Sequence, residues 1–464
     1  ELGFEGLSVT DWEDITKLVN RHRVAVNQKE AVYLVLEAGI DMAMVPYDYS
    51  FYGLALQLVK EGRISEARID ESVRRILKLK YELGLFANPY PEKAAIPNLY
   101  PKETDQAALN AARESLVLLK NNDATLPLKK GAKVFVTGPT ANYMPSLSGS
   151  WSYTWQGTNT AFYPKGAQTI LQAIQAKNGA ANVTYKEGVD IKGEAKSTDQ
   201  ELLAEANKAD YIIVCLGEDA YAEIPGNIDD LNLAPAQKRL ASVFEKAGKP
   251  VIYVLAEGRP RTFTDIEPIA KSVLLAPQPG TQGGTAIAEV LFGEVNPSGK
   301  LAFTYHKAPN DLLTYDANYS DVVPENGNLS ANQVGIQYRP LYPFGHGLSY
   351  TTFAYSNLTV SKTQLVGESD AVTISVTVTN TGKLEGKEAT DLFVTDLVAS
   401  VNPAYRKHKG FVKNTLKPGE SKTITFTLKV SDLTMTNAQN VTLTEPGDFL
   451  IHIAGLEKTI NYKK

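Results

Sequence analysis

The chain has 464 residues, more than one ordinary domain contains, and this length predicts about three domains. Hydrophobic residues make up 43% of the chain and charged residues 21%, which is enough apolar material for several cores. A net charge of −5 argues against a nucleic-acid-binding protein, because such proteins carry a basic face. The sequence contains no apolar run of about 18 residues, so we predict no membrane-spanning helix.

The first part of the chain alternates between strand and helix patterns. Residues 4–11 predict a short strand that ends in polar side chains, and residues 40–45 predict a second strand. Helices are predicted at 28–38, 50–60 and 65–83. This alternation is typical of a parallel sheet with connecting helices.

A second α/β region follows a linker. Residues 87–101 contain four prolines and predict the linker, and residues 103–120 predict a helix. Beyond them, apolar strand patterns alternate with helical ones, which indicates a mostly parallel sheet. Strands are predicted at 133–137, 211–216, 251–255 and 272–275, and helices near 167–176, 199–207, 235–247 and 283–292. The single cysteine, Cys215, lies in one of these strands and is interpreted as a buried apolar side chain.

The pattern changes again near residue 353. Residues 304–348 are irregular and rich in Asn, Pro and Tyr. After them, apolar residues alternate with Thr and Ser at 372–378 and 424–428, and Gly-containing turns separate such runs. We predict an antiparallel β-sandwich of about 110 residues.

Acidic side chains follow two of the predicted strands. Asp11 ends the first strand of the chain, and Glu218 and Glu223 lie in the loop after the strand at 211–216. Parallel sheets place catalytic groups at the carboxyl ends of their strands. Each feature has a plainer interpretation, in which Asp11 caps the next turn and the loop at 217–227 is a solvated acidic segment.

A loop rich in glycine and serine contains three aromatic residues, Trp151, Tyr153 and Trp155. Aromatic rings stack on the C–H faces of sugar rings, so these residues are candidates for substrate binding. Anchoring in a core is the alternative. The five histidines are scattered without paired ligand spacing, and we predict neither a metal site nor a cofactor.

Taken in order, these features resemble glycoside hydrolase family 3 over essentially the whole chain. Residues 3–12 (Gly-Phe-Glu-Gly-Leu-Ser-Val-Thr-Asp-Trp) are similar to the nucleophile strand of the family, with Thr10 where Ser is more common. Residues 38–46 resemble the last strand of the family's barrel, and residues 68–77 resemble the helix that closes it. Residues 343–350 resemble the segment that leads into a fibronectin type III-like module.

The resemblance implies an α/β plus all-β fold class with five segments. Residues 1–90 are expected to form the last two βα units of a (β/α)8 barrel, the C-terminal part of a TIM-barrel domain. A linker and leading helix (91–130) and an α/β sandwich domain with a mostly parallel sheet (131–303), which carries the acid/base, are expected next. A connecting segment (304–352) and a fibronectin type III-like β-sandwich (353–464) complete the expectation.

The resemblance also assigns roles to side chains. Asp11 matches the catalytic nucleophile and Glu223 the general acid/base, with Glu218 as the alternative. Trp12 and Trp155 match two tryptophans that enclose the sugar. The implied activity is that of a retaining, exo-acting β-glucosidase, which releases terminal non-reducing β-D-glucosyl residues by double displacement. A β-xylosidase of the same family and a non-catalytic glycan-binding protein on a hydrolase scaffold are the alternatives.

The expected partners follow from the incomplete barrel. A (β/α)8 barrel has eight strands, and this chain resembles only the last two. We therefore expect an upstream segment or a separate chain to complete the barrel, because a two-stranded fragment leaves its sheet edge exposed. The isolated chain is expected to be inactive. The expected substrate is a β-linked gluco-oligosaccharide or glucoside, encountered in the periplasm or outside the cell.

Overall fold

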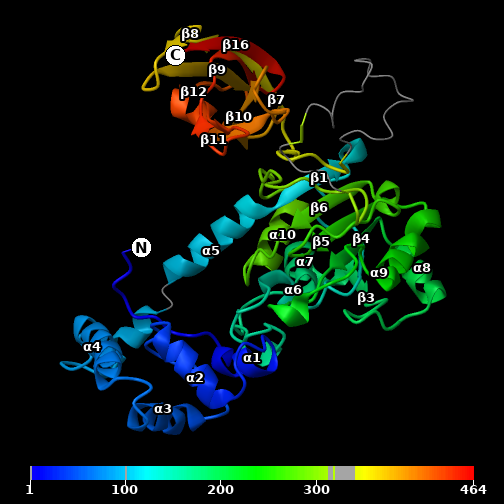
Figure 1. The fold of residues 1–464 in the computed structure, drawn as a ribbon. Coiled ribbons are helices and arrows are strands. Elements are labelled where there is room, and N and C mark those ends of the chain that lie inside the picture. Colours follow the sequence, from blue (N-terminus) through cyan, green and yellow to red (C-terminus); the bar gives the residue numbers. More distant parts are fainter. Residues whose placement is uncertain (1–2, 100–101, 312–316, 319–339) are drawn as a thin grey trace. The chain divides into compact units, whose positions relative to one another are not determined.

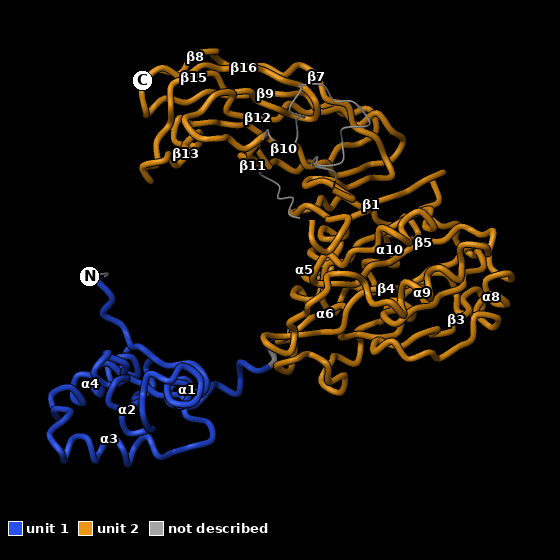
Figure 2. Tube along the Cα trace, turned by 45° about the vertical axis from the view of Figure 1, so that its right-hand side comes forward, with its two compact units in different colours: residues 1–101 blue, residues 102–464 orange. Residues whose placement is uncertain are grey.

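The computed structural model describes residues 3–99, 102–311, 317–318 and 340–464, with the side chain of Pro97 excepted. These residues form two compact units, Glu1–Pro101 and Lys102–Lys464 (Figure 2). Each unit is described by itself. Within the described residues, no helix combines the length and the apolar character that a membrane crossing requires.

Unit 1 is mainly helical. Its helices are α1 (Asp14–Asn20), α2 (Gln28–Glu37), α3 (Ser50–Lys60) and α4 (Glu66–Glu82). The three helices expected from the sequence are confirmed. Two of them begin at side-chain caps, because Asn27 accepts a hydrogen bond from the Glu30 amide and Ser65 accepts one from the Arg68 amide. Helix α1 was not predicted.

The two strands expected in unit 1 are reduced to a single parallel bridge between Val9 and Met42. The Thr10 amide donates to the Met42 carbonyl at 3.1 Å, and the Met42 amide donates to the Ser8 carbonyl at 3.1 Å. Each short segment has only the other as a neighbour within the unit, so a regular ladder does not develop. The described part of unit 1 therefore contains one parallel pairing but no complete sheet.

Unit 2 begins with an α/β domain that has three layers (Figure 1). The central sheet has the strand order β1-β6-β5-β4-β2-β3. Its strands are β1 (Val117–Asn121), β2 (Val134–Thr137), β3 (Val183–Lys186), β4 (Tyr211–Gly217), β5 (Val251–Ala256) and β6 (Ser272–Ala276). All neighbours are parallel except β1, which pairs with β6 in the antiparallel sense.

Helices pack on both faces of this sheet and bury a core on each side. One face is covered by α5 (Lys102–Ser115), α6 (Pro145–Ser148), α7 (Ile170–Asn178) and α10 (Gly283–Leu291). The other face is covered by α8 (Asp199–Lys208) and α9 (Pro235–Val243). Cys215 is fully buried among apolar side chains in the first of these cores, as the sequence predicted.

The helix expected at 103–120 was predicted too long. Helix α5 ends at Ser115, and β1 follows it. Leu116, Val117, Leu118 and Leu119 are all at most 3% exposed. A continuous apolar run of this kind fits the buried side of a sheet, and pairing with β6 decides the conformation. Strand β3 was missed, because only Val183 of its four residues is buried.

A β-sandwich follows, with one sheet of order β11-β10-β15-β16-β8 and another of order β12-β9-β7. Its strands are β7 (Phe353–Val360), β8 (Gln364–Val366), β9 (Ala371–Asn380), β10 (Gly386–Asp396), β11 (Lys407–Leu416), β12 (Ser421–Lys429), β15 (Gly447–Ile453) and β16 (Leu456–Lys463), beside a small ribbon of β13 (Met435–Thr436) and β14 (Thr442–Leu443). The alternation expected at 372–378 and 424–428 is confirmed: Ile424 pairs with Val376, and Phe426 pairs with Ile374. The alternating apolar residues of both strands are buried in the sandwich core.

Short 3-10 helices connect several of these elements. They are η1 (Lys93–Asn98), η2 (Asn122–Ala124), η3 (Thr160–Phe162), η4 (Ala180–Asn182), η5 (Ile224–Gly226), η6 (Phe244–Lys246), η7 (Glu267–Ile269) and η9 (Val430–Leu433). The residue bounds expected for the domains stay predictions.

Candidate active site

The carboxyl ends of β2, β4, β5 and β6 lie along one edge of the parallel sheet. Glycines allow the chain to leave this edge at two strands. A Cβ atom at Gly138 would lie 2.1 Å from the Cys215 carbonyl oxygen, and one at Gly217 would lie 1.8 Å from that of Ala256. Only glycine fits at these two positions, so the loops that carry the candidate residues start directly at the sheet.

The loop after β4 presents Glu223 at an exposed tip. Glu223 has φ 53° and ψ −144°, an unusual backbone conformation for a residue with a side chain, and η5 begins immediately after it. The Gly226 amide donates to the Glu223 carbonyl at 2.8 Å and closes this turn. The turn therefore displays the Glu223 carboxylate on a short, hydrogen-bonded projection.

Glu218, the alternative acid/base, has a different environment. Its side chain is 8% exposed, and its Oε1 forms ion pairs with Arg259 at 2.7 Å and with Arg261 at 3.2 Å. Its Oε2 accepts hydrogen bonds from the backbone amides of Gly258 and Arg259, at 3.3 and 3.0 Å. Both carboxylate oxygens are thus engaged in holding the loop after β5, unlike those of the exposed Glu223.

The loop at 149–157 exposes its three aromatic side chains. Trp151 is 69% exposed, Tyr153 50% and Trp155 46%, so anchoring in a core does not account for them. The Trp151 amide donates to the Trp155 carbonyl at 2.9 Å, and Trp151 and Tyr153 both have positive φ. The Tyr153 ring lies 5.0 Å from that of Tyr163. A compact, turned loop therefore holds these rings at the surface.

The structure brings this aromatic loop and the Glu223 loop together. The Gln156 side-chain amide donates to the Ala222 carbonyl and accepts from the Ala222 amide, both at 3.0 Å. Tyr143 donates to Asp219 at 2.8 Å from the loop after β2. Trp155 and Glu223 are thus each next in sequence to a residue of the Gln156–Ala222 pair. Sequence reasoning missed Gln156, because one glutamine in a polar loop carries no pattern.

Asp11 lies in unit 1, just after the parallel bridge. Its Oδ1 accepts the Trp12 amide at 2.6 Å, and its Oδ2 has no partner among the described residues. Helix α1 has Glu13 at its N-cap, without a side-chain cap, so Asp11 does not cap this helix, although its carboxylate accepts an amide of the turn that precedes it. Trp12 is 49% exposed and makes an edge contact with Tyr47 at 5.8 Å. The carboxylate therefore keeps one oxygen free.

Thr10, where the resemblance leads us to expect Ser, uses its hydroxyl to accept the Met44 amide at 2.9 Å. A serine hydroxyl can accept the same bond, so the change is conservative for the local backbone. Hydrogen bonds thereby join the segment that contains Asp11 to the segment that contains Met42 on both sides of the Val9–Met42 bridge.

A buried carboxylate fixes these two segments. Asp41 accepts hydrogen bonds from the Ser8 amide at 3.0 Å, from the Ser72 hydroxyl at 2.7 Å and from Arg75 at 3.1 Å. Burial acts to raise the pKa of Asp41, but the hydrogen bonds from Ser8, Ser72 and Arg75 outweigh it and leave the pKa below its ordinary value. Asp41 thus joins the Asp11 segment to helix α4. Sequence reasoning did not assign it a role.

Glu257, at the end of β5, is buried beneath the loops with 3% exposure. Its Oε1 accepts the Tyr305 hydroxyl at 2.7 Å, and its Oε2 has no hydrogen-bond partner among the described residues. Burial above all, opposed by the Tyr305 hydrogen bond and aided by the charge of Glu218, raises the pKa of Glu257 to about 8. Near neutral pH this carboxyl group is therefore mainly protonated.

We expect Glu257→Gln to change the pH dependence of stability. The pKa of Glu257 is about 8 in the folded state and 4.5 ordinarily, so the folded state binds this proton more tightly than the unfolded state. The stability that the proton contributes is therefore lost as the pH rises from 4.5 to about 8. Glutamine cannot ionise. As the pH rises, the unfolding free energy of the variant should increase relative to that of the wild type by up to about 1.4 kcal/mol per pH unit. Urea unfolding from about pH 5 to about pH 8 measures this gain. Glu103→Gln, at an exposed position on α5, is the control, and equal pH profiles for Glu257→Gln and wild type would contradict the expectation.

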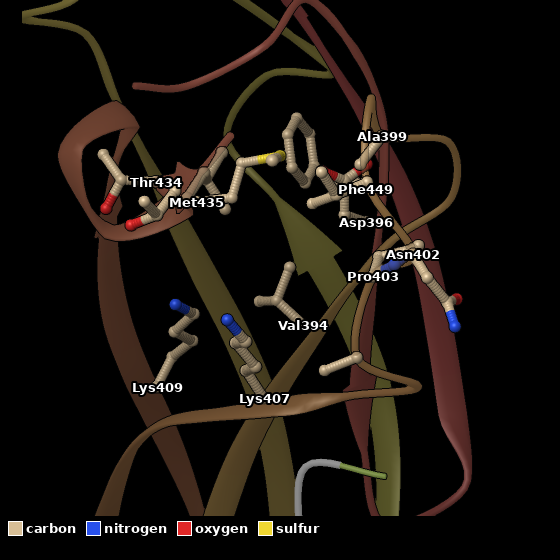
Figure 3. A pocket seen from close by; sticks show the side chains of 14 residues that line it. Val394, Asp396, Ala399, Asn402, Pro403, Lys407, Lys409, Thr434, Met435 and Phe449 are labelled. Atoms are coloured by element: carbon tan, nitrogen blue, oxygen red, sulfur yellow. The ribbon is translucent and has the colours of Figure 1, made fainter. Parts of the chain in front are cut away.

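A cavity of about 300 Å³ lies in the β-sandwich, away from these loops (Figure 3). Lys407 and Lys409 of β11 point into it, beside apolar Val394 and Phe449. The cavity lining contains none of the predicted site residues. Across the described part of the chain, no three His, Cys, Asp or Glu side chains lie together as metal ligands would.

Comparison with known proteins agrees with this architecture. Residues 116–350 match the glycosyl hydrolase family 3 C-terminal domain, residues 1–79 match the N terminal domain of that family, and residues 388–456 match a fibronectin type III-like domain. These matches place the chain among the glycosyl hydrolases. The chain belongs to glycoside hydrolase family 3.

Several named relatives align with almost the whole chain. It is 40% identical to the lysosomal beta glucosidase of Dictyostelium discoideum and 35% identical to the periplasmic beta-glucosidase of Salmonella typhimurium, over 98% of this chain in both cases. It is 33% identical to a beta-xylosidase of Formosa agariphila over its full length. The chain spans 56%, 62% and 64% of these three relatives.

A solved structure has the same fold. The beta-glucosidase from Listeria innocua in complex with isofagomine superposes with a TM-score of 0.83 at 28% sequence identity. The match covers 99% of this chain and 64% of that protein.

Proposed function

We propose that this chain is part of a retaining, exo-acting β-glucosidase, with Asp11 as nucleophile and Glu223 as general acid/base. The observation that carries the proposal is the pairing of the loop that displays Glu223 with the loop that exposes Trp155. Relatives named as beta-glucosidases, aligned over nearly the whole chain, support the substrate class. The free carboxylate oxygen of Asp11 supports its role.

The proposed chemistry assigns one task to each carboxylate. Asp11 attacks the anomeric carbon and forms a covalent glycosyl-enzyme, while Glu223 protonates the departing glycosidic oxygen. Glu223 then removes a proton from water, which attacks the same carbon and releases the sugar with its configuration retained. This sequence requires the two carboxyl groups to be about 5–5.5 Å apart during the reaction. Glu218 is less suited, because both of its oxygens are already engaged.

Aromatic side chains supply the proposed sugar-binding surfaces. Trp12 and Trp155 are each about half exposed and carry indole faces that can stack on a pyranose ring. Trp151 and Tyr153 extend the aromatic surface of the loop at 149–157 and are proposed to contact the next part of the substrate.

We propose that further residues complete the barrel, from an upstream segment or a separate chain. Apolar side chains near the bridge are exposed in unit 1: Phe4 is 71% exposed, Val9 51% and Met42 50%. Exposed apolar side chains in these two segments fit surfaces that the rest of a barrel would cover. The chain without that complement is expected to be inactive. Its proposed working place is the periplasm or the cell exterior, the first of which agrees with the name of the Salmonella typhimurium relative.

Product stereochemistry tests this function. Proton NMR during hydrolysis of p-nitrophenyl β-glucoside by the barrel-complete protein should show β-glucose first, with the α anomer appearing only by later mutarotation. p-Nitrophenyl β-xyloside is the second arm, because one relative is a beta-xylosidase. Higher kcat/KM on the xyloside would favour that activity. Binding of both sugars without turnover would support a glycan-binding protein instead.

A further inference from the structure

The tip that carries Glu223 is fastened on both sides. Before the tip, Gln156 holds both backbone groups of Ala222, with two hydrogen bonds of 3.0 Å. After the tip, the Arg259 guanidinium donates to the Gly226 carbonyl. The two sets of hydrogen bonds come from different loops, one after α6 and one after β5. Only residues 223–225 lie between the fastened positions.

Arg259 is itself held firmly. It binds Oε1 of Glu218 through Nε at 2.9 Å and through a terminal nitrogen at 2.7 Å, a two-pronged contact in which both nitrogens meet one oxygen. Its guanidinium carbon also lies 3.8 Å from the centre of the Tyr221 ring, within the acid/base loop itself. Arg259 therefore joins the start of that loop, its middle and its far end. The geometry of a planar guanidinium makes this possible, and an ammonium group cannot reproduce it.

The backbone at Glu223 needs such support. A non-glycine residue at φ 53° and ψ −144° is strained, and this conformation persists only where neighbouring contacts enforce it. The Gln156 and Arg259 contacts flank the strained residue. Without them, the tip is free to relax to an ordinary conformation and to turn the carboxyl group away.

We propose that Gln156 and Arg259 are positioning residues that hold the strained tip, so that Glu223 presents its proton to the glycosidic oxygen. This inference rests on the proposed function of Glu223. The arrangement acts through geometry, because a general acid must lie within hydrogen-bond reach of the departing oxygen. A displacement of about 1 Å can lower the rate about 100-fold.

The rate depends more strongly on the position of the general acid when the leaving group is more basic. A sugar alkoxide needs the proton from Glu223, whereas 2,4-dinitrophenolate departs without it. Loss of either fastening should therefore affect disaccharides strongly and activated aryl glucosides weakly. A residue that serves only to stabilise the fold does not discriminate between leaving groups.

Two conservative variants test the proposal in the barrel-complete protein. Gln156→Asn keeps the amide but shortens its reach, and Arg259→Lys keeps the charge but loses the planar, two-pronged contact. We expect kcat/KM, which reports formation of the glycosyl-enzyme, to fall by about 10- to 100-fold on laminaribiose and by less than about 3-fold on 2,4-dinitrophenyl β-glucoside. Arg239→Ala, which removes an exposed ion pair with Asp199 in the same domain, is the control and should leave both rates unchanged.

The outcomes separate this inference from the function on which it rests. Equal losses on both substrates, or no loss on either, would overturn the positioning role of the two residues. Since Arg259→Lys loosens a buried pair, a thermal unfolding midpoint measured for each variant shows whether it folds, and Gln156→Asn keeps the test decisive if Arg259→Lys does not. If Asp11→Asn leaves hydrolysis intact, the proposed function itself fails, whatever the two variants show.

Discussion

Replacing Asp11 by Asn should abolish hydrolysis of every β-glucoside, with a loss in kcat of about 10⁴-fold or more in the barrel-complete protein. Asparagine has nearly the same shape and can still accept the Trp12 amide through its carbonyl oxygen, so the local backbone should survive. What it lacks is the negative charge that attacks the anomeric carbon. Activated and unactivated substrates should lose rate together, because both need the nucleophile.

Initial rates on p-nitrophenyl β-glucoside and on laminaribiose measure this loss. Asp70→Asn is the matched control, since Asp70 is an exposed carboxylate on α4 of the same unit. The control should retain the wild-type rate. An Asp11→Asn enzyme with more than about a tenth of wild-type activity would exclude Asp11 as the nucleophile.

Replacing Glu223 by Gln should give a different kinetic pattern. Hydrolysis of laminaribiose should fall by about 10³-fold, because no group then protonates the departing sugar. Formation of the glycosyl-enzyme from 2,4-dinitrophenyl β-glucoside should be nearly unaffected, since that leaving group needs no proton. The glycosyl-enzyme should accumulate, because water attacks it slowly without the general base.

Added azide distinguishes this role from a structural one. Azide is a good nucleophile that needs no general base, so it should raise the turnover of the aryl glucoside by Glu223→Gln and form β-glucosyl azide. Glu194→Gln, which changes an exposed glutamate of the same domain, is the control. A Glu223→Gln enzyme that lost the same factor on both substrates and ignored azide would assign the acid/base role elsewhere.

Much of the fold could be predicted because periodicity reflects burial. The buried strands β4, β5 and β6 are continuous apolar runs, and the sandwich strands β9 and β12 alternate in register with each other. The sequence predictions were wrong where pairing with a segment distant in sequence determines the secondary structure. The segment 117–121 forms a strand because β6 pairs with it, although its apolar run also fits the end of a helix.

The two strands predicted for unit 1 illustrate the same limit in the opposite direction. Residues 4–11 and 40–45 have strand patterns, yet within unit 1 they form only the Val9–Met42 bridge. A strand pattern in the sequence indicates that a segment can form a strand when neighbouring strands are present to pair with it. The exposed apolar side chains of Phe4 and Met42 suit such neighbours.

For the candidate site, the sequence indicated only the residues that would carry out the chemistry, and their roles stay predictions. Asp11 and the loop with Glu223 stood out because carboxylates follow predicted strand ends, and the aromatic loop stood out by its tryptophans among glycine and serine. The roles of these residues came from the family resemblance. The residues that arrange them did not stand out. Gln156 acts through two backbone hydrogen bonds and Arg259 through contacts that span more than thirty positions in sequence, and neither leaves a local pattern.

We propose that Asp11 and Glu223 act on one sugar carbon. The most direct measurement is a crystal structure of the barrel-complete protein trapped with 2,4-dinitrophenyl 2-deoxy-2-fluoro-β-glucoside. We expect a bond from the sugar's anomeric carbon to Asp11, with the Glu223 carboxyl group about 5–5.5 Å from that of Asp11. A sugar bound to another carboxylate, or Glu223 facing a surface that the sugar does not reach, would contradict it.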